Sequence, residues 1–142
     1  MRTPDEIQQE YIDAFLSRGD AFEQFDYLLQ VSAQLEELAD ELKVEDVLVK
    51  GCQSQVWLYP AWEGGEVGRG FMLKGDSDTL MVRGVIKIFT DMFAGQDAQA
   101  IVDCPVRFVH ETELAYVFDA QRQAGVSAIA KVIKDFASKA IA

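Results

Sequence analysis

The chain has 142 residues, 49% of them hydrophobic, which is enough for one domain with its own core, and we expect a single domain over residues 1–142. Thirteen Lys and Arg against twenty-four Asp and Glu give a formal net charge of −11, which would repel a phosphate backbone and an anionic bilayer, so neither nucleic acid nor membrane is an expected partner. One histidine and two cysteines are too few for the usual zinc or iron–sulfur ligand sets, so no metal is expected.

The first 46 residues predict two helices. Thr3, Pro4 and Glu6 have the spacing of a capping box with proline at the first helical position, and apolar residues follow at helical intervals. A turn at Gly19 separates this helix from a second amphipathic segment, whose apolar stripe runs from Phe22 to Leu42. An acidic linker over residues 43–46 then leads into the next part of the chain.

The middle of the chain predicts a small antiparallel sheet of about three strands. Residues 47–49 and 56–59 are β-prone, Gly64 and Gly65 indicate a hairpin turn, and residues 67–73 return as a further strand. Packed against helices, such a sheet gives the α+β class.

The second half is mostly helical. Asp76 or Ser77 is expected to cap a helix that is apolar nearly all round and therefore belongs at the centre of the fold, under the sheet. Asp97 is expected to cap a short helix, and a last helix is expected to begin near Asp119. Arg122 is unusual there, because a cation in the first turn opposes the helix dipole.

The best candidate for a chemical function is the polar, glycine-hinged turn around Cys52, which lies between two apolar segments. A thiol reacts as its thiolate, and polar surroundings with Lys50 two residues away are compatible with that anion. The lone His110 has no spacing that brings it to Cys52, and no CxxC pair is present. The chemical function that remains is a covalent carrier that uses a single cysteine, Cys52. Cys104 lies between a helix end and a proline, which favours a packing role over a chemical one.

The cysteine turn resembles the active-site motif of SufE-like cysteine desulfuration proteins, in the string GCQSQVW over residues 51–57. The resemblance continues through the GDSD of residues 75–78, through residues 82–84, and through Arg122 with Gly125 at the start of the final helix. It covers most of the chain, from about residue 20 to the end. The fold that it implies is shared with scaffold proteins of the IscU type.

This resemblance also implies a function and a set of site residues. Cys52 would accept sulfane sulfur from a SufS-like cysteine desulfurase, stimulate that enzyme, and pass the sulfur to a SufB-like iron–sulfur scaffold. Gly51, Gln53 and Ser54 would shape the loop, and Asp78 and Arg122 would lie near the loop or the partner interface. The desulfurase would hold pyridoxal phosphate (PLP), so this chain needs no cofactor and acts as an accessory carrier rather than a stand-alone enzyme.

Two other functions remain open at this point. In the first, the chain is a non-covalent adaptor that regulates a desulfurase while Cys52 is incidental. In the second, it is a thiol redox sensor that uses Cys52 with Cys104, which requires the two to come close enough to bridge. With no secretory leader visible, and no apolar run near the roughly 20 residues that a bilayer requires, the expected location is the cytoplasm, where thiols stay reduced.

Overall fold

The structure is a computed structural model that describes residues 1–141. Its elements, in chain order, are α1 (Pro4–Leu16), α2 (Ala21–Ser32), the short 3-10 turns η1 (Asp40–Leu42) and η2 (Glu45–Val47), β1 (Val56–Trp62), η3 (Glu63–Gly65), β2 (Phe71–Ser77), α3 (Leu80–Phe93), α4 (Ala98–Asp103), α5 (Leu114–Val117) and α6 (Ala120–Lys139). The α+β class expected from the sequence is confirmed, with a small antiparallel sheet packed against helices.

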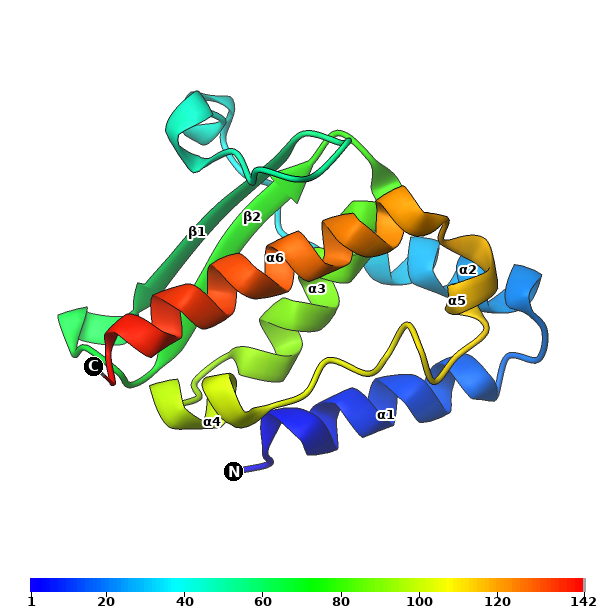
Figure 1. The fold of residues 1–142 in the computed structure, drawn as a ribbon, viewed down its shortest axis with the longest axis horizontal. Coiled ribbons are helices and arrows are strands. Elements are labelled where there is room, and N and C mark those ends of the chain that lie inside the picture. Colours follow the sequence, from blue (N-terminus) through cyan, green and yellow to red (C-terminus); the bar gives the residue numbers. More distant parts are fainter. Residues whose placement is uncertain (142) are drawn as a thin grey trace.

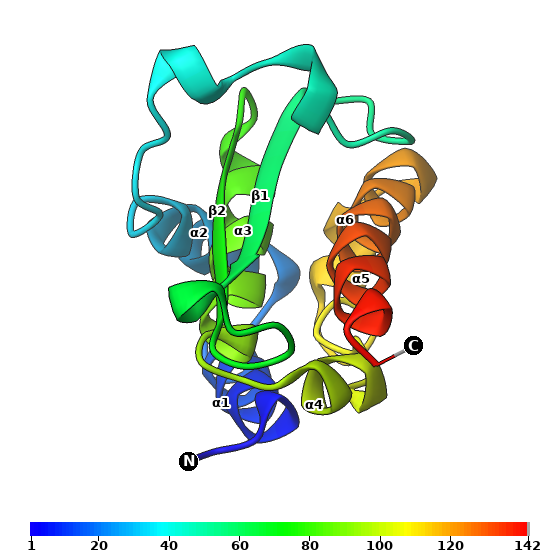
Figure 2. The ribbon, with the colours of Figure 1, turned by 90° about the vertical axis from the view of Figure 1, so that its left-hand side faces the viewer.

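Helix α3 lies at the centre of the molecule, as its nearly all-round apolar sequence predicts. It contacts β2 along one side and packs against α1, α2 and α6 on the others. Figures 1 and 2 show the two-stranded ribbon on one side of this helix, with α6 running along it and α1 beneath. The buried side chains that α3 brings to the core are Met81, Val85, Ile86, Ile88, Phe89, Met92 and Phe93.

A glycine permits the close approach of α2 to α3. A Cβ on Gly84 would lie 2.7 Å from Leu28 Cδ1 and 2.8 Å from the Leu28 carbonyl oxygen, so a larger residue there would push the two helices apart. The sequence resemblance over residues 82–84 therefore includes a residue with a clear packing role.

The sheet has two strands in the described residues, not about three. The expected strand at 47–49 is wrong, because the turn η2 ends at Val47. The chain then pairs with β1 through an isolated bridge between Leu48 and Trp57 and the adjacent hydrogen bond from the Val49 N–H to the Val56 carbonyl. The expected strand at 67–73 begins later, since Gly68 and Gly70 have φ values of +90° and +67°, which strand residues do not adopt. Strand β2 thus covers Phe71–Ser77, with Val56 opposite Ser77 and Trp62 opposite Phe71.

The helix expected over residues 22–42 stops at Ser32. A turn over residues 33–35 and a stretch without regular secondary structure follow, and Leu35 and Leu38 are buried from this non-helical segment instead. Like charges four residues apart, Glu36 with Asp40 and Glu37 with Glu41, disfavour a continued helix.

Three helix starts were predicted at the right residues. Thr3 forms the full capping box with Glu6, and the side chains of Asp97 and Asp119 accept first-turn amides of α4 and α6. The predicted cap of α3 is wrong, because the helix begins after Thr79, and Asp76 lies in β2.

Asp76 is instead a buried carboxylate that joins three parts of the chain. Its oxygens lie 3.3 Å from Arg83 Nη1 on α3 and 3.4 Å from Lys43 Nζ in the linker, and its side chain is 3% exposed. It also accepts the backbone N–H of Ser77 at 2.8 Å. The linker before the cysteine loop is therefore held against the end of β2 by charge.

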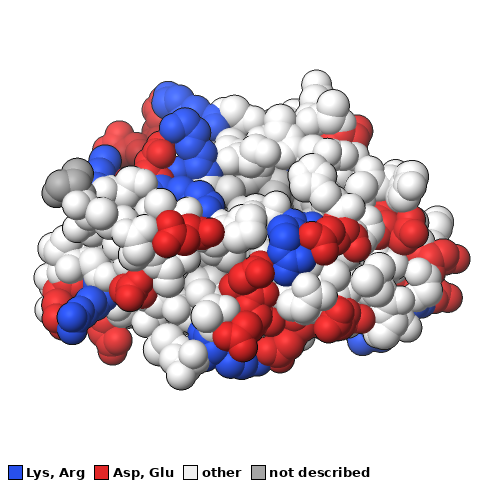
Figure 3. Space-filling view, turned by 60° about the horizontal axis from the view of Figure 1, so that its bottom comes forward, with Lys and Arg blue, Asp and Glu red and all other residues white. Residues whose placement is uncertain are grey.

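The surface charge is unevenly distributed. Helix α1 carries Asp5, Glu6, Glu10 and Asp13 and has no Lys or Arg. Figure 3 shows acidic side chains gathered over the face on the α1 side, with fewer basic ones between them. Such a face repels polyanions. Among the described residues, no helix is long and apolar enough to cross a membrane.

Candidate functional site

The site is built around a six-residue loop, residues 50–55, with Cys52 near its tip. The two ends of the loop are joined where the Val49 N–H donates to the Val56 carbonyl at 2.8 Å, next to the bridge between Leu48 and Trp57. Gly51 has a φ of +88°, a left-handed conformation that residues with a Cβ rarely adopt. The backbone thus requires glycine immediately before the cysteine.

The corner between β2 and α3 clamps one side of this loop. The Gln55 N–H donates to Asp78 Oδ1 at 3.1 Å, and the Asp78 N–H donates to the Gln55 carbonyl at 3.3 Å. The Thr79 hydroxyl donates to Ser54 Oγ at 2.8 Å. Asp78 therefore lies beside the loop and holds its backbone, while the part of Thr79 was not predicted from the sequence.

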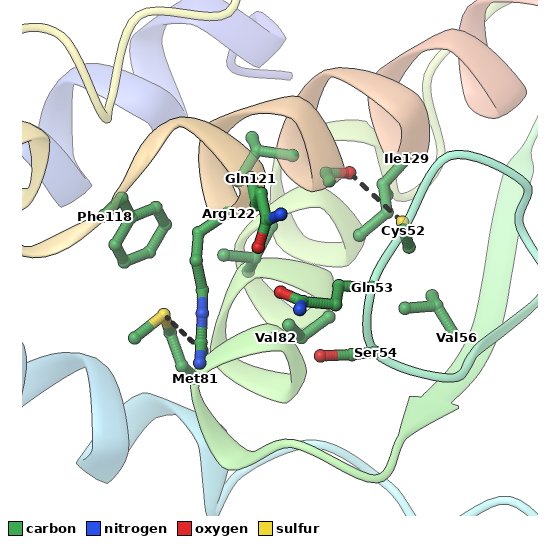
Figure 4. Close-up of a pocket in the computed structure, with 13 residues that line it drawn as sticks. Cys52, Gln53, Ser54, Val56, Met81, Val82, Phe118, Gln121, Arg122 and Ile129 are labelled. Carbon is green, nitrogen blue, oxygen red and sulfur yellow. Dashed lines mark hydrogen bonds between the residues drawn. The ribbon is translucent and has the colours of Figure 1, made fainter.

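The Cys52 side chain is half-buried and points toward α6. Its Sγ lies 3.6 Å from the Gly125 carbonyl oxygen, which accepts the thiol hydrogen. Figure 4 shows this contact at the edge of a pocket between the loop, α3 and α6, which we call the sulfur pocket. Its volume is about 20 Å³, room for about one water-sized group. The residues lining it are Cys52, Gln53, Ser54, Val56, Met81, Val82, Val85, Phe118, Gln121, Arg122, Gly125, Val126 and Ile129.

Burial raises the pKa of the Cys52 thiol above its ordinary value. The apolar walls of the sulfur pocket remove water that would stabilise the thiolate, so the neutral thiol is favoured in this position. In this inward position the sulfur is protected rather than activated.

The raised pKa predicts a pH dependence for the reaction of Cys52 with iodoacetamide. Only the thiolate reacts, and a higher pKa means less thiolate at a given pH, so the rate should still be rising above the pH of about 8.5 at which an unperturbed cysteine is half ionised. Rates measured by mass spectrometry from pH 6 to 10 on the folded and the urea-unfolded chain check this. A folded-state midpoint at or below the unfolded one would contradict it.

Arg122 projects into the same pocket from the first turn of α6. Its Nη1 lies 3.5 Å from Met81 Sδ, and it forms no ion pair with a carboxylate within residues 1–141. In Figure 4 Arg122 and Gln53 point into the space between α3 and α6. This placement sets the positive charge of Arg122, which opposes the helix dipole, in the pocket that Cys52 also lines.

The structure brings all six predicted site residues together. Gly51, Cys52, Gln53 and Ser54 form the loop, Asp78 clamps it, and Arg122 shares the sulfur pocket with Cys52. Sequence reasoning did not assign Met81, Phe118 or Thr79 to the site. They come from two distant helix ends, and no local pattern links them to residues 50–55.

Cys104 and His110 lie elsewhere. Cys104 is 4% exposed, and burial, the largest cause, raises its pKa to about 11. Its carbonyl accepts from Lys134 Nζ on α6, nine residues beyond the Gly125 that contacts Cys52. At 1.5 Å per residue, Gly125 and Lys134 are about 13.5 Å apart along the helix axis. The two cysteines therefore lie against different turns of α6, whereas a disulfide needs the two Cα atoms within about 7 Å. His110 lines a different pocket, with Lys131 and Lys134.

A half-buried thiol on a clamped loop over an apolar pocket, in an α+β frame, suits a small protein that carries a group on one cysteine. Comparison with known proteins agrees. Residues 9–137 match the family model described as "SufE: Fe-S metabolism associated domain". An uncharacterized SufE-like protein of Rhizobium etli is 29% identical over 125 residues, covering 87% of this chain and 84% of the relative.

The fold has a solved counterpart. The solution structure of a hypothetical protein from Thermus thermophilus matches with a TM-score of 0.76 at 19% identity, over 99% of this chain and 98% of that one. At this identity the match is evidence of a shared fold and of nothing further. The chain belongs to the SufE family, as the resemblance of its cysteine motif predicts. Membership gives it a sulfur-transfer role in Fe–S metabolism, with a cysteine desulfurase as the implied partner.

Proposed function

We propose that this chain is a sulfur acceptor whose working atom is Cys52 Sγ. A SufS-like cysteine desulfurase, which holds the PLP, supplies the sulfur, and a SufB-like iron–sulfur scaffold receives it. The chain stimulates the desulfurase by removing its sulfur, and is a carrier rather than a stand-alone enzyme. Its single domain, residues 1–142, works in the cytoplasm, where both cysteines remain free thiols.

The transfer is a thiol exchange with no net oxidation. The Cys52 thiolate, its proton given to solvent, attacks the terminal sulfur of the donor's persulfide, R–S–SH. A new bond forms between the two sulfurs, the donor's S–S bond breaks, and the donor leaves as its thiolate R–S⁻. Cys52 then carries S–SH, and the donor cysteine is free to begin another turnover.

The observation that carries the proposal is the placement of Cys52 Sγ. It is half-buried, on a loop joined at its two ends, and faces a pocket with room for about one more atom-sized group. Val82, Phe118 and Ile129 give this pocket apolar walls that would shield a persulfide from reductants in solution. Arg122 offers a positive charge to the anionic form of the persulfide.

The half-buried sulfur also implies that the loop has a second position. In the inward position the thiol points at Gly125. For Cys52 to attack a persulfide on a donor protein, the tip of the loop must turn outward. Only a few weak contacts hold the tip itself, since the strong hydrogen bonds lie at Ser54, Gln55 and Val49. Docking of the donor can therefore release Cys52 without unfolding the sheet.

Loading by a desulfurase tests the proposal. The purified chain is incubated with a PLP-dependent cysteine desulfurase and L-cysteine, and then weighed intact without reductant. We expect a gain of about 32 Da that dithiothreitol removes, the mass of one sulfur atom held as a persulfide. Peptide mapping should place it on Cys52. No gain, or a gain confined to Cys104, would contradict the proposal.

A further inference from the structure

Gly125, in the second turn of α6, faces Cys52 in the sulfur pocket. Its carbonyl oxygen lies 3.6 Å from Cys52 Sγ, and a Cβ added to it would lie 3.7 Å from the same sulfur. Gly125 thus approaches the thiol with its backbone alone. The space that a side chain would fill belongs to the sulfur pocket, because Gly125 is one of the residues that line it.

Neither the backbone nor the packing of α6 requires a glycine at this position. The φ of Gly125 is not in the left-handed region, and in a helix interior glycine is less favourable than every residue except proline. Within residues 1–141, and apart from its chain neighbours and the backbone of α6, the only atom within 4 Å of an added Cβ is Cys52 Sγ. Gly84 differs, because a Cβ there would clash with Leu28. What the glycine at position 125 provides is open space beside the sulfur.

That space suits one added sulfur atom. The sulfur pocket has a volume of about 20 Å³, which is room for about one water-sized group. A sulfur bonded to Cys52 lies about 2 Å beyond Sγ. A methyl group at position 125 would touch Sγ at 3.7 Å and take up the room that the added atom needs. The inward position therefore fits a thiol with or without this methyl group, but a persulfide only without it.

We propose that Gly125 is a specificity-determining residue, which keeps the inward position of Cys52 open to a single added sulfur atom and closed to larger adducts. A chain of two added sulfurs, or a mixed disulfide with glutathione, exceeds this space and holds the loop outward. There a thiolate in solution attacks the outer sulfur of the S–S bond and displaces Cys52 as its thiolate. This inference rests on the proposed function, because it states which cargo the carrier retains.

The test measures how fast dithiothreitol removes the added sulfur from the loaded chain. Wild type, Gly125→Ala and the control Ser127→Ala are loaded by a cysteine desulfurase with L-cysteine, separated from the donor, and followed by intact mass. Ser127 is exposed on the same helix and lies outside the sulfur pocket. We expect Gly125→Ala to lose its sulfur about tenfold faster than wild type, because overpacking disfavours the inward position. Ser127→Ala should match wild type.

Two further measurements separate lost space from other effects of the alanine. The mixed disulfide of Cys52 with glutathione, formed from oxidised glutathione, should be reduced at the same rate in wild type and in Gly125→Ala, because it stays outward in both. In urea denaturation of the unloaded chains, Gly125→Ala should have the higher midpoint, because alanine favours the helix and the thiol still fits.

Equal rates of persulfide loss from Gly125→Ala and wild type would overturn the inference. So would a faster loss of the glutathione adduct in this variant, a lower urea midpoint, or an equally fast loss of persulfide from Ser127→Ala. If Gly125→Ala took up no sulfur while wild type did, the space would serve the transfer and not the storage, and the inference would again be wrong. In all these cases wild type loads and the proposed function stands. Failure of the wild-type chain to load would overturn both.

Discussion

Cys52→Ser should abolish both sulfur loading and stimulation of the desulfurase. A serine hydroxyl cannot hold a sulfane sulfur as a persulfide, so the donor's sulfur is never removed and its turnover falls to the rate without acceptor. The substitution is nearly isosteric at a half-buried position, so the fold and the donor-binding surface should survive. Alanine formation over a range of acceptor concentrations, with intact mass in parallel, measures both effects.

Cys104→Ser is the matched control, and its thiol lies in the core rather than in the sulfur pocket. After correction for any loss of folded protein, it should load and stimulate as wild type does. A non-covalent adaptor would behave differently, because Cys52→Ser would still stimulate the desulfurase. A redox pair would lose function with either substitution. Full stimulation by Cys52→Ser would overturn the carrier mechanism.

Asp76→Ala should cause the largest loss of stability among single substitutions of charged residues. It leaves Arg83 and Lys43 without their shared carboxylate, and within residues 1–141 the buried Arg83 Nε already has no hydrogen-bond partner. Because the Arg83 and Lys43 side chains are 21% and 27% exposed, water can replace part of the lost carboxylate. We therefore expect a loss of about 1.5–3 kcal/mol, the contribution of hydrogen bonds to charged groups, which is still a large part of the total for a domain of this size. Urea denaturation followed by circular dichroism measures the free energy of unfolding.

Asp135→Ala gives the comparison for this prediction. Asp135 pairs with Lys131 one turn away on α6, and both side chains are more than half exposed. Such surface pairs contribute about 0.3–0.5 kcal/mol. If Asp76→Ala lost no more stability than Asp135→Ala, the cluster of Lys43, Asp76 and Arg83 would not hold the linker as described.

The sequence predicted well where local chemistry decides the structure. Thr3, Asp97 and Asp119 start helices because each side chain can bond amides three residues on, and this needs no tertiary information. The apolar sequence of α3 likewise predicted its central position. The motif around Cys52 predicted the family, and the family match confirmed that resemblance.

Predictions failed where contacts between residues far apart in the sequence determine the structure. Asp76 is of a residue type that often caps helices. It lies in β2 instead, where it forms ion pairs with Arg83 and with Lys43, 33 residues earlier. Leu35 and Leu38 have helical spacing, yet they reach the core from a non-helical segment. The walls of the sulfur pocket were missed for the same reason, because Met81 and Phe118 meet only when α3 and α6 pack together.

The joined ends of the cysteine loop limit how far sulfur can travel. Cys52 is three residues beyond Val49, where the N–H bonded to Val56 ties the loop to the sheet. Even fully extended, three residues span about 10 Å. Cys52 is thus a short arm and not a long swinging tether, so any sulfur donor must bring its own reactive atom within about 10 Å of Val49.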